Sequence, residues 1–414
     1  MAAGEAVAAV DDQHSPADVQ AAAALLRETA ADRATVLITG AGSKLGWGGP
    51  VIGPDLEINT RHLDQLIDYR PGDMTVAVQA GMPLEALQPI LAEHGQWLAI
   101  DPPTQTAGAT IGGLLVSGDA GPRRLRHGTL RDLSIGCTLV LADGTIARAG
   151  GHVIKNVAGY DLTKLMHGSL GTLALVAEVV LRLNPLPAAG RTITCTLDAT
   201  GATRATAAVI GSGVEPSAIE WSGSPSSTGI LLVRLDGTAR TIEALSNHAV
   251  RALRDSGAHD PEVLSEGPST SSGISIPEPG DSIPEPVEGQ PHPAIIRLGT
   301  LPDQLPMITD KINTLADRHQ VEVWMISSTG LGLHTARLSG PVRGQAALID
   351  ELGAVVQQLG GSLALRDRDP ELDRVRGTSA PMPEPPPATA LQRAVKDRFD
   401  PDHRLAPGRF APWF

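Results

Sequence analysis

Aromatic residues and cysteines are both scarce in this 414-residue sequence, and each scarcity limits what the chain can be. Phe, Trp and Tyr together make up 2% of the residues, so the hydrophobic cores must be built from Ala, Val, Leu and Ile. The two cysteines, Cys137 and Cys195, form no CxxC pair. Since an iron–sulfur cluster held by cysteine takes about four thiolates, we expect no such cluster in this chain and two buried, apolar thiols.

Long apolar runs and positive charge are also lacking. No segment approaches the roughly 18 apolar residues of a membrane span, and no basic stretch of the signal-peptide kind opens the sequence. The formal net charge is -13, and the longest basic cluster, Arg123 to Arg131, is short. Because an acidic chain repels phosphate backbones, we expect no nucleic-acid partner. We expect a cytoplasmic protein whose contact with a membrane would be peripheral and made through partners.

Apolar residues and glycine are plentiful, at 42% hydrophobic residues and 45 glycines. At about 100–200 residues per domain, the length predicts two or three domains. The sequence Asn184 to Pro187 indicates a boundary. We predict a first domain over 1–187, a cap domain over 188–375, and a C-terminal helix and tail over 376–414 that return to the first domain. Within the cap, 265–293 is rich in Pro, Ser, Gly and Glu, so we expect it to be disordered.

Local patterns predict both helices and strands. In the first domain they indicate a helix over 16–33 with Ser15 as its N-cap, strands over 35–39, 75–79 and 173–183, a helix over 83–94, and a hairpin over 134–147. In the cap, strand and helix signals alternate over 191–197, 203–211, 217–221, 229–235 and 238–255, which is typical of an antiparallel sheet with helices. A last helix is predicted over 389–398.

A glycine-rich loop, Gly40-Ala41-Gly42-Ser43-Lys44, directly follows the strand over 35–39. Glycines let a backbone approach an anion and point N–H groups at it. The third glycine, Gly46, comes one residue too late for a dinucleotide-binding βαβ fingerprint, and no Gly-Lys-Ser/Thr of a Walker loop is present. We interpret the loop as a phosphate cradle between extended segments, with a plain structural turn as the open alternative.

Three more glycine-rich segments lie within the next ~130 residues, over 101–114, 117–124 and 155–172. Glycine in ordered structure is entropically costly, so its clustering indicates that backbone closely approaches something other than the chain's own packing. Together with the first loop, these segments predict one ligand held by several turns.

This ordered set resembles the FAD-binding domain of the vanillyl-alcohol oxidase superfamily (the p-cresol methylhydroxylase type), and within it the FAD-binding E subunits of bacterial glycolate oxidases. The resemblance covers about 20–187 and the tail. It is carried by Gly40 to Lys44, Ala120 to Arg124, Lys155 to Leu162 with the following Gly-Ser-x-Gly, and Phe399 to Pro401 with Pro407 to Arg409. The implied fold is α+β, with an FAD-binding domain of two α/β lobes and a smaller α+β cap with an antiparallel sheet.

The resemblance implies FAD as the cofactor. Backbone amides of the first loop would hold its pyrophosphate, the second loop would line its isoalloxazine and ribityl chain, and the strand after Thr172 would contact its adenine side. The implied FAD-binding residues are Gly40, Ala41, Gly42, Ser43, Lys44, Pro102, Thr110, Gly112, Gly113, Ser117, Gly118 and Val176. Some relatives attach FAD to a His of the first loop. That loop contains no His here, so we expect non-covalent FAD.

The resemblance also implies a reaction and partners. A small 2-hydroxy acid such as glycolate or D-lactate would be oxidised to a 2-oxo acid, with hydride passing to flavin N5 and a base taking the hydroxyl proton. A second flavin subunit and an iron–sulfur subunit would complete the complex. Two alternatives stay open: an accessory FAD-binding subunit that transfers electrons or scaffolds a partner, and a stand-alone aldonolactone or sugar oxidase.

The sequence does not identify the catalytic base, but it offers four candidates for catalysis. Arg123 has a guanidinium that matches a substrate carboxylate. Lys155 could stabilise negative charge on a reduced flavin, and Tyr160 could donate a hydrogen bond to flavin or substrate. His334 lies where the cap of some relatives carries a His-rich metal motif. Here one His and no carboxylate leave too few ligands, so we expect no metal.

Each candidate has a structural alternative. The guanidinium of Arg123 could instead form an ion pair within the chain, with Asp119, Asp132 or Asp161 as the considered partners. A solvated lysine, a packed tyrosine and a structural histidine are the corresponding alternatives for the other three.

Overall fold

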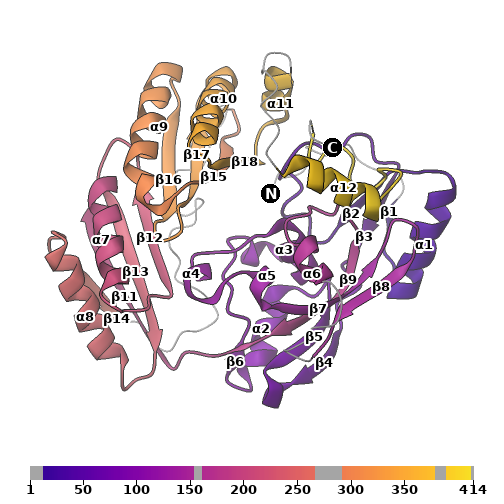
Figure 1. Cartoon of the computed structure of the whole chain (residues 1–414), viewed down its shortest axis with the longest axis horizontal. Helices are drawn as coiled ribbons and strands as arrows, with labels where there is room; N and C mark the ends of the chain where they lie inside the picture. Colours follow the sequence, from indigo (N-terminus) through magenta and orange to yellow (C-terminus); the bar gives the residue numbers. More distant parts are fainter. Residues whose placement is uncertain (1–12, 153–160, 266–290, 378–387, 412–414) are drawn as a thin grey trace. The chain divides into compact units, whose positions relative to one another are not determined.

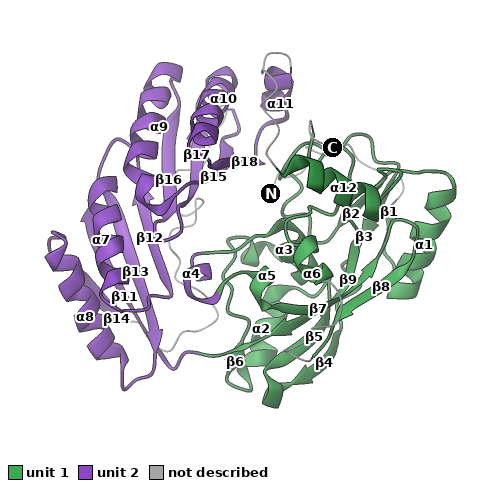
Figure 2. Cartoon of the chain, in the orientation of Figure 1, with its two compact units in different colours: residues 1–121, 128–186, 384–414 green, residues 122–127, 187–383 purple. Residues whose placement is uncertain are grey.

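The computed structural model describes residues 13–152, 161–265, 291–377 and 388–411 (Figure 1). The chain divides into two compact units (Figure 2). Unit 1 comprises 1–121, 128–186 and 384–414, and unit 2 comprises 122–127 and 187–383. The segment 122–127, which the sequence placed in the first domain, therefore belongs to unit 2. Most of the insertion 265–293 lies outside the described residues, so its disorder stays a prediction.

Unit 1 contains a small parallel sheet with the strand order β1-β3-β2, formed by Gln13–His14, Leu56–Asn59 and Val36–Thr39. Helix α1, Val19–Ala31, begins later than the sequence predicted. The side chain of Asp18, and not that of Ser15, caps it by accepting a hydrogen bond from the Ala21 amide, 2.7 Å away. Since this carboxylate satisfies an otherwise unpaired amide of the first turn, it sets the start of the helix.

A five-stranded antiparallel sheet forms the second part of unit 1, in the order β4-β5-β9-β7-β8. Its strands are Leu66–Arg70, Thr75–Gln79, Leu175–Arg182, Ser134–Val140 and Ile146–Gly150. The strand predictions at 75–79 and 173–183 and the hairpin after 134 are confirmed. A separate two-stranded antiparallel ladder pairs β6, Gln96–Trp97, with β10, Asn184–Pro185. The helices are α2, Leu84–Ala92; α3, Ile111–Ser117; α5, Leu130–Leu133; and α6, Leu162–Met166.

The C-terminal segment packs within unit 1. Helix α12, Thr389–Phe399, confirms the predicted last helix, and the chain then forms a parallel bridge between Leu405 and Val36 of β2. The Val36 amide donates to the carbonyl of Arg404, and the Ala406 amide donates to the carbonyl of Val36, both at 2.8 Å. The tail thus extends the small sheet at the strand that leads into the first glycine loop.

Unit 2 confirms the predicted antiparallel sheet, which has eight strands in the order β14-β11-β13-β12-β16-β17-β15-β18. Two βαββαβ repeats build it, joined through β12 and β16. The first repeat is β11 Ala189–Leu197, α7 Ala199–Gly211, β12 Ala218–Gly223, β13 Gly229–Gly237, α8 Ile242–Asp255 and β14 Glu262–Ser265. The second is β15 Ala294–Gly299, α9 Leu305–His319, β16 Glu322–Ser328, β17 Leu333–Ser339, α10 Val342–Gln358 and β18 Ser362–Asp367. Two short helices, α4 Arg124–His127 and α11 Pro370–Gly377, complete unit 2.

The two faces of this eight-stranded sheet differ in chemistry. Helices α7 to α10 cover one face (Figure 1), where alternate strand residues such as Ile219, Val233 and Met325 join one apolar core. The intervening residues point to the other face, as the period of two in a strand requires. That face carries the charged side chains Glu220, Arg234, Asp236, Arg297 and Arg337. None of the helices in the described ranges is long and apolar enough to cross a membrane.

Candidate functional site

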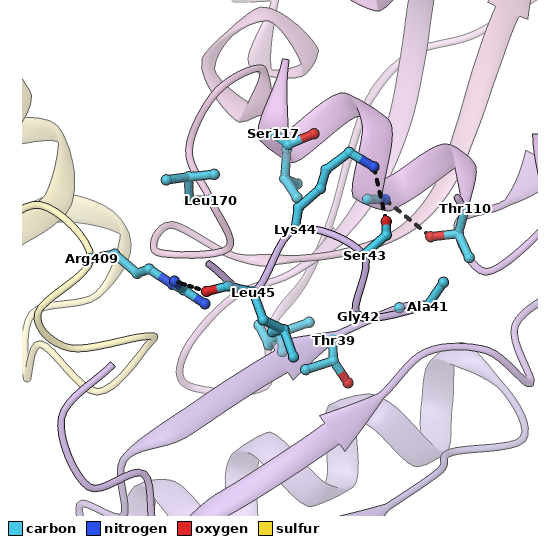
Figure 3. Close-up of a pocket in the computed structure, with 14 residues that line it drawn as sticks. Thr39, Ala41, Gly42, Ser43, Lys44, Leu45, Thr110, Ser117, Leu170 and Arg409 are labelled. Atoms are coloured by element: carbon cyan, nitrogen blue, oxygen red, sulfur yellow. Dashed lines mark hydrogen bonds between the residues drawn. The ribbon is translucent and has the colours of Figure 1, made fainter. Parts of the chain in front are cut away.

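A pocket in unit 1 lies where β2 ends and the first glycine loop begins (Figure 3). Strand β2 of the small sheet ends at Thr39, and the glycine loop begins at the next residue, Gly40. Helix α3, the loop residue Leu170 and the C-terminal tail supply the other walls. The lining residues are Ile38, Thr39, Gly40, Ala41, Gly42, Ser43, Lys44, Leu45, Thr110, Gly113, Val116, Ser117, Leu170 and Arg409.

Glycine is required in the loop for two different reasons. Gly42 has φ +78°, in the left-handed region that residues with a Cβ rarely adopt. At Gly40 the reason is space, since a Cβ there would lie 2.5 Å from Oγ1 of Thr110. The loop backbone therefore runs directly against the start of α3. This close approach brings the main chain of the loop to the pocket wall, beside the side chains of Ser43 and Lys44.

Thr110 also fixes the helix that forms the opposite wall. Its Oγ1 accepts a hydrogen bond from the Gly113 amide at 3.2 Å, which caps α3 and sets where the helix begins (Figure 3). One turn further on, Ser117 lines the same pocket. A single threonine thus holds the helix in place and limits how the glycine loop can approach it.

Lys44 places a positive charge at the pocket wall. Its Nζ lies 3.1 Å from Oγ of Ser43 and 3.6 Å from Oδ2 of Asp119, and it lies 5.9 Å from the ring centroid of Trp47. The Asp119 side chain is 2% exposed and accepts a hydrogen bond from Oγ1 of Thr104 at 2.7 Å. The lysine ammonium is therefore held by the chain itself at the pocket wall, where it would attract a phosphate.

The pocket brings together eight of the twelve residues that the sequence implied for FAD, and four lie elsewhere. The eight are Gly40, Ala41, Gly42, Ser43, Lys44, Thr110, Gly113 and Ser117. Of the others, Gly112 packs against Ala80, where an added Cβ would lie 2.7 Å from the Ala80 Cβ, and Gly118 ends α3 with φ +65°. Val176 is buried in the core of the five-stranded sheet, and Pro102 is not among the lining residues.

Six lining residues were missed by sequence reasoning. Ile38, Thr39, Leu45 and Val116 adjoin predicted residues in the sequence, so extending each motif by one or two positions would have included them. Leu170 has φ +51°, a left-handed backbone conformation that is rare for leucine and that the sequence does not predict. Arg409 comes from the tail, more than 360 residues from the loop, and only the tail's place in the family resemblance pointed to it.

The guanidinium of Arg123 is engaged within unit 2. Its Nη1 donates to Oδ2 of Asp236 at 2.9 Å, and Nε of Arg234 donates to Oδ1 of the same carboxylate at 2.9 Å. All three side chains are buried. The structure gives Asp236, which lies 113 residues away, as an ion-pair partner of Arg123, whereas the sequence had offered Asp119, Asp132 and Asp161 as candidates.

His334 lies on the helix-covered face of the unit 2 sheet and is fully buried. Its Nε2 lies 2.9 Å from Oγ1 of Thr300 and its Nδ1 lies 3.0 Å from Oγ of Ser327, so both ring nitrogens have partners in the chain. Burial and the nearby charge of Arg297 lower the pKa of His334 to about 4. The ring is neutral at pH 7, and this placement favours a structural role. Lys155 and Tyr160, the remaining candidates, lie outside the described residues.

Glu220 is a buried titratable group that sequence reasoning did not single out. It lies on the opposite face of the same sheet, and its Oε1 accepts a hydrogen bond from Oγ of Ser328 at 3.1 Å. Burial raises the pKa of this carboxyl to about 7, although the Ser328 hydroxyl and the Arg297 charge act to lower it. Within the described ranges, no group of three or more His, Cys, Asp or Glu residues is placed to hold a metal ion.

Comparison with known proteins identifies the region around the pocket. Residues 14–161 match the family described as FAD binding domain. The loop, Thr110, Gly113 and Ser117 all fall within this match. A glycine loop that lines the pocket together with a lysine fits a dinucleotide cofactor. FAD is therefore the cofactor of this domain.

Among curated proteins, the chain is 35% identical over 164 residues to glycolate oxidase subunit GlcE of Escherichia coli, covering 40% of this chain and 46% of that protein. It is 25% identical over 405 residues to glycolate oxidase subunit GlcD of Bacillus subtilis, covering 91% and 84%. It is 32% identical over 172 residues to D-2-hydroxyglutarate dehydrogenase of Xanthomonas citri, covering 42% and 36%. The aligned part thus spans less than half the length of the first and third of these relatives.

A solved structure shares the fold along nearly the whole chain. Alkyldihydroxyacetonephosphate synthase superposes with a TM-score of 0.71 at 15% sequence identity, covering 95% of this chain and 75% of that one. A second crystal form of the synthase gives a TM-score of 0.66 at 14% identity. At this identity the likeness concerns the fold alone, and it supports the p-cresol methylhydroxylase-type architecture expected from the sequence.

Proposed function

We propose that this chain is the FAD-binding subunit of a glycolate oxidase-like complex that oxidises a small 2-hydroxy acid to a 2-oxo acid. The pocket that carries this proposal combines a glycine loop, a buried lysine and the start of α3 inside the segment that matches an FAD binding domain. Support for the substrate class comes from the relatives, whose names are glycolate oxidase subunits and a D-2-hydroxyglutarate dehydrogenase.

In this proposal the residues of the chain bind the FAD and orient it. The backbone amides of Gly40 to Lys44 hold the diphosphate, and the Lys44 ammonium adds positive charge beside it. When bound, the flavin supplies the acceptor for the hydride removed from the substrate. The first loop, Gly40 to Lys44, contains no His, so we propose that the FAD is bound non-covalently.

The two cysteines support the assignment of iron–sulfur chemistry to a partner. Both thiols are buried in unit cores. Burial raises the pKa of Cys137, and burial raises the pKa of Cys195 to about 11. Two thiols in separate cores are also fewer than the roughly four that a cluster takes. We propose a second flavin subunit and an iron–sulfur subunit as the partners, with electrons leaving this chain toward them.

A second candidate is an accessory subunit that binds FAD without turning over a substrate by itself. One observation favours it, which is that both described candidates for substrate chemistry are engaged inside unit 2. Arg123 is paired with Asp236, and both nitrogens of His334 are bonded in the core.

A spectroscopic experiment tests both candidates. The chain is purified alone, supplied with FAD, and its visible spectrum is recorded without oxygen before and after addition of glycolate or D-lactate. Bleaching of the flavin band supports a catalytic 2-hydroxy-acid oxidising subunit. A flavin band that persists with each acid supports the accessory role. A protein that stays colourless with excess FAD contradicts both.

A further inference from the structure

Arg409 of the C-terminal tail is bonded to the backbone that continues the glycine loop. Its side chain is buried, at 5% exposure, and it lines the pocket. From one nitrogen, Nη1, it donates to the carbonyl oxygens of Leu45, Trp47 and Gly49, at 2.5, 2.9 and 3.3 Å; Figure 3 shows the bond to Leu45. Three carbonyls of one short segment thus converge on a single guanidinium.

Convergent carbonyls repel one another unless a donor lies between them, because each carries a partial negative charge. The guanidinium supplies that donor, and the bonds it forms are of the stronger, charge-assisted kind. When carbonyls of Leu45 to Gly49 are held on the Arg409 side, the backbone of this segment cannot turn freely. The orientation of the preceding loop, Gly40 to Lys44, is fixed as a consequence at its C-terminal end.

The tail approaches the same segment closely with its own backbone. The Gly49 amide donates to the carbonyl of Arg409 at 2.8 Å. An added Cβ at Gly48 would lie 2.8 Å from the Arg409 oxygen, and one at Gly49 would lie 2.2 Å from the Gly408 oxygen. Glycine at both positions therefore serves the contact with the tail, independently of any ligand.

The tail itself is firmly anchored. Asp400 is fully buried and accepts hydrogen bonds from Nζ of Lys396 and from the amides of Arg404 and Leu405. The Arg404 side chain donates to the carbonyls of Ala34 and Ala142 and to the hydroxyl of a threonine in α1. Arg409 is thus presented from a fixed support.

We propose that Arg409 is a positioning residue that keeps the first glycine loop in the conformation that binds the FAD diphosphate. The proposal rests on the proposed function, since it takes FAD as the ligand. Arg409 acts through the loop backbone, and the diphosphate is bound by the amides and not by the guanidinium.

The chain offers a matched control for this residue. Arg404 is also a buried arginine of the tail and also donates to three oxygens, but none of them belongs to the loop or lines the pocket. We therefore compare Arg409→Ala with Arg404→Ala in the full chain. For each variant, the FAD Kd is measured by quenching of flavin fluorescence, and the melting temperature of the FAD-free protein is measured separately.

The positioning role predicts that Arg409→Ala raises the FAD Kd about tenfold or more, since several charge-assisted hydrogen bonds are lost. Arg404→Ala is expected to lower the melting temperature of the FAD-free protein and to change the Kd by less than about twofold. An Arg409→Ala variant with an unchanged Kd, or equal Kd changes in the two variants, would overturn the proposal. If Arg409→Ala does not fold, Arg409→Lys is compared in the same way. A smaller rise in the FAD Kd is expected, because lysine keeps the positive charge but loses the planar set of guanidinium donors.

Ionic strength separates positioning from direct contact with the anion. A direct charge–charge attraction is screened by salt. The Kd ratio of Arg409→Ala to the unchanged protein should therefore be the same at low and high salt, and a ratio that falls at high salt overturns the positioning role. Failure of the unchanged protein to bind FAD would contradict the proposed function. Equal FAD affinity of the unchanged protein and Arg409→Ala would contradict only the positioning role of Arg409.

Discussion

The ammonium of Lys44 lies 3.6 Å from a carboxylate oxygen of Asp119, and both side chains are buried, at 9% and 2% exposure. This pair holds the Lys44 ammonium at the wall of the pocket. Its counterion, the Asp119 carboxylate, is in turn held by a hydrogen bond from the Thr104 hydroxyl. A diphosphate that binds to the loop would share the lysine with Asp119. The pair therefore connects the stability of the FAD-free chain with its affinity for the cofactor.

Changing Asp119→Asn is expected to lower the melting temperature of the FAD-free protein. A buried charge whose partner is removed costs about 3–5 kcal/mol. FAD should then stabilise the variant more than it stabilises the unchanged protein, because the diphosphate supplies the missing negative charge. Thermal melts with and without FAD measure both effects. An FAD-induced shift no larger than that of the unchanged protein would show that Lys44 does not face the cofactor.

Changing Gly40→Ala is expected to weaken FAD binding and to destabilise α3. The new Cβ would lie 2.5 Å from Oγ1 of Thr110, so the threonine must move and lose its cap on Gly113, at a cost of about 1 kcal/mol. Gly72→Ala is the control, because nothing lies within 4 Å of a Cβ there. The double change Gly40→Ala with Thr110→Ala should cost less than the sum of the single changes. Additive costs in urea unfolding would contradict the contact.

The pH dependence of stability is expected to change in Glu220→Gln. Folding raises the pKa of Glu220 from 4.5 to about 7, so the fold favours the protonated carboxyl. Its contribution is fully present below pH 4.5 and is lost as the pH rises through 7, by on the order of 3 kcal/mol. The neutral glutamine keeps the shape and does not titrate. The stability of the variant relative to the unchanged protein should therefore rise between about pH 5 and about pH 8 in urea unfolding; a difference that is independent of pH would contradict the raised pKa.

Changing Asp400→Ala is expected to release the tail. The carboxylate is fully buried and accepts hydrogen bonds from Lys396, Arg404 and Leu405, so its loss should cost about 3–5 kcal/mol. Asp402→Ala, two residues away, is the control. Its carboxylate is 46% exposed and lies 3.6 Å from the Arg33 side chain, a surface pair worth about 0–1 kcal/mol. Equal losses of stability in the two variants would contradict the anchoring role of Asp400.

Much of the pocket could be predicted from the sequence because its main wall is local. Gly40 and Gly42 follow a buried strand directly, and both the glycine preference and the strand are readable from neighbouring residues. Thr110 and Gly113 could be predicted for the same reason. The α3 glycines were harder to separate, since Gly112 serves packing against Ala80 while Gly113 lines the pocket. Sequence alone does not show which face of a short helix meets the ligand.

The parts that the sequence did not predict depend on contacts between distant residues. Arg123 pairs with Asp236, 113 residues away, and no local charge pattern distinguishes that aspartate from nearer ones. Arg409 reaches a backbone segment more than 360 residues before it. The start of α1 at Asp18 shows the same limit on a smaller scale, because Ser15 and Asp18 both suit a helix cap and only the formed hydrogen bond decides between them.

Whether this pocket holds FAD is tested most directly by a calorimetric titration of the FAD-free chain with FAD, made in parallel on an Ala41→Trp variant. Ala41 lines the pocket, so the indole would fill the space beside the loop. We expect one FAD per chain for the unchanged protein and no binding for an Ala41→Trp variant that keeps its melting temperature. Equal binding by a folded Ala41→Trp variant would contradict the claim that this pocket holds the cofactor.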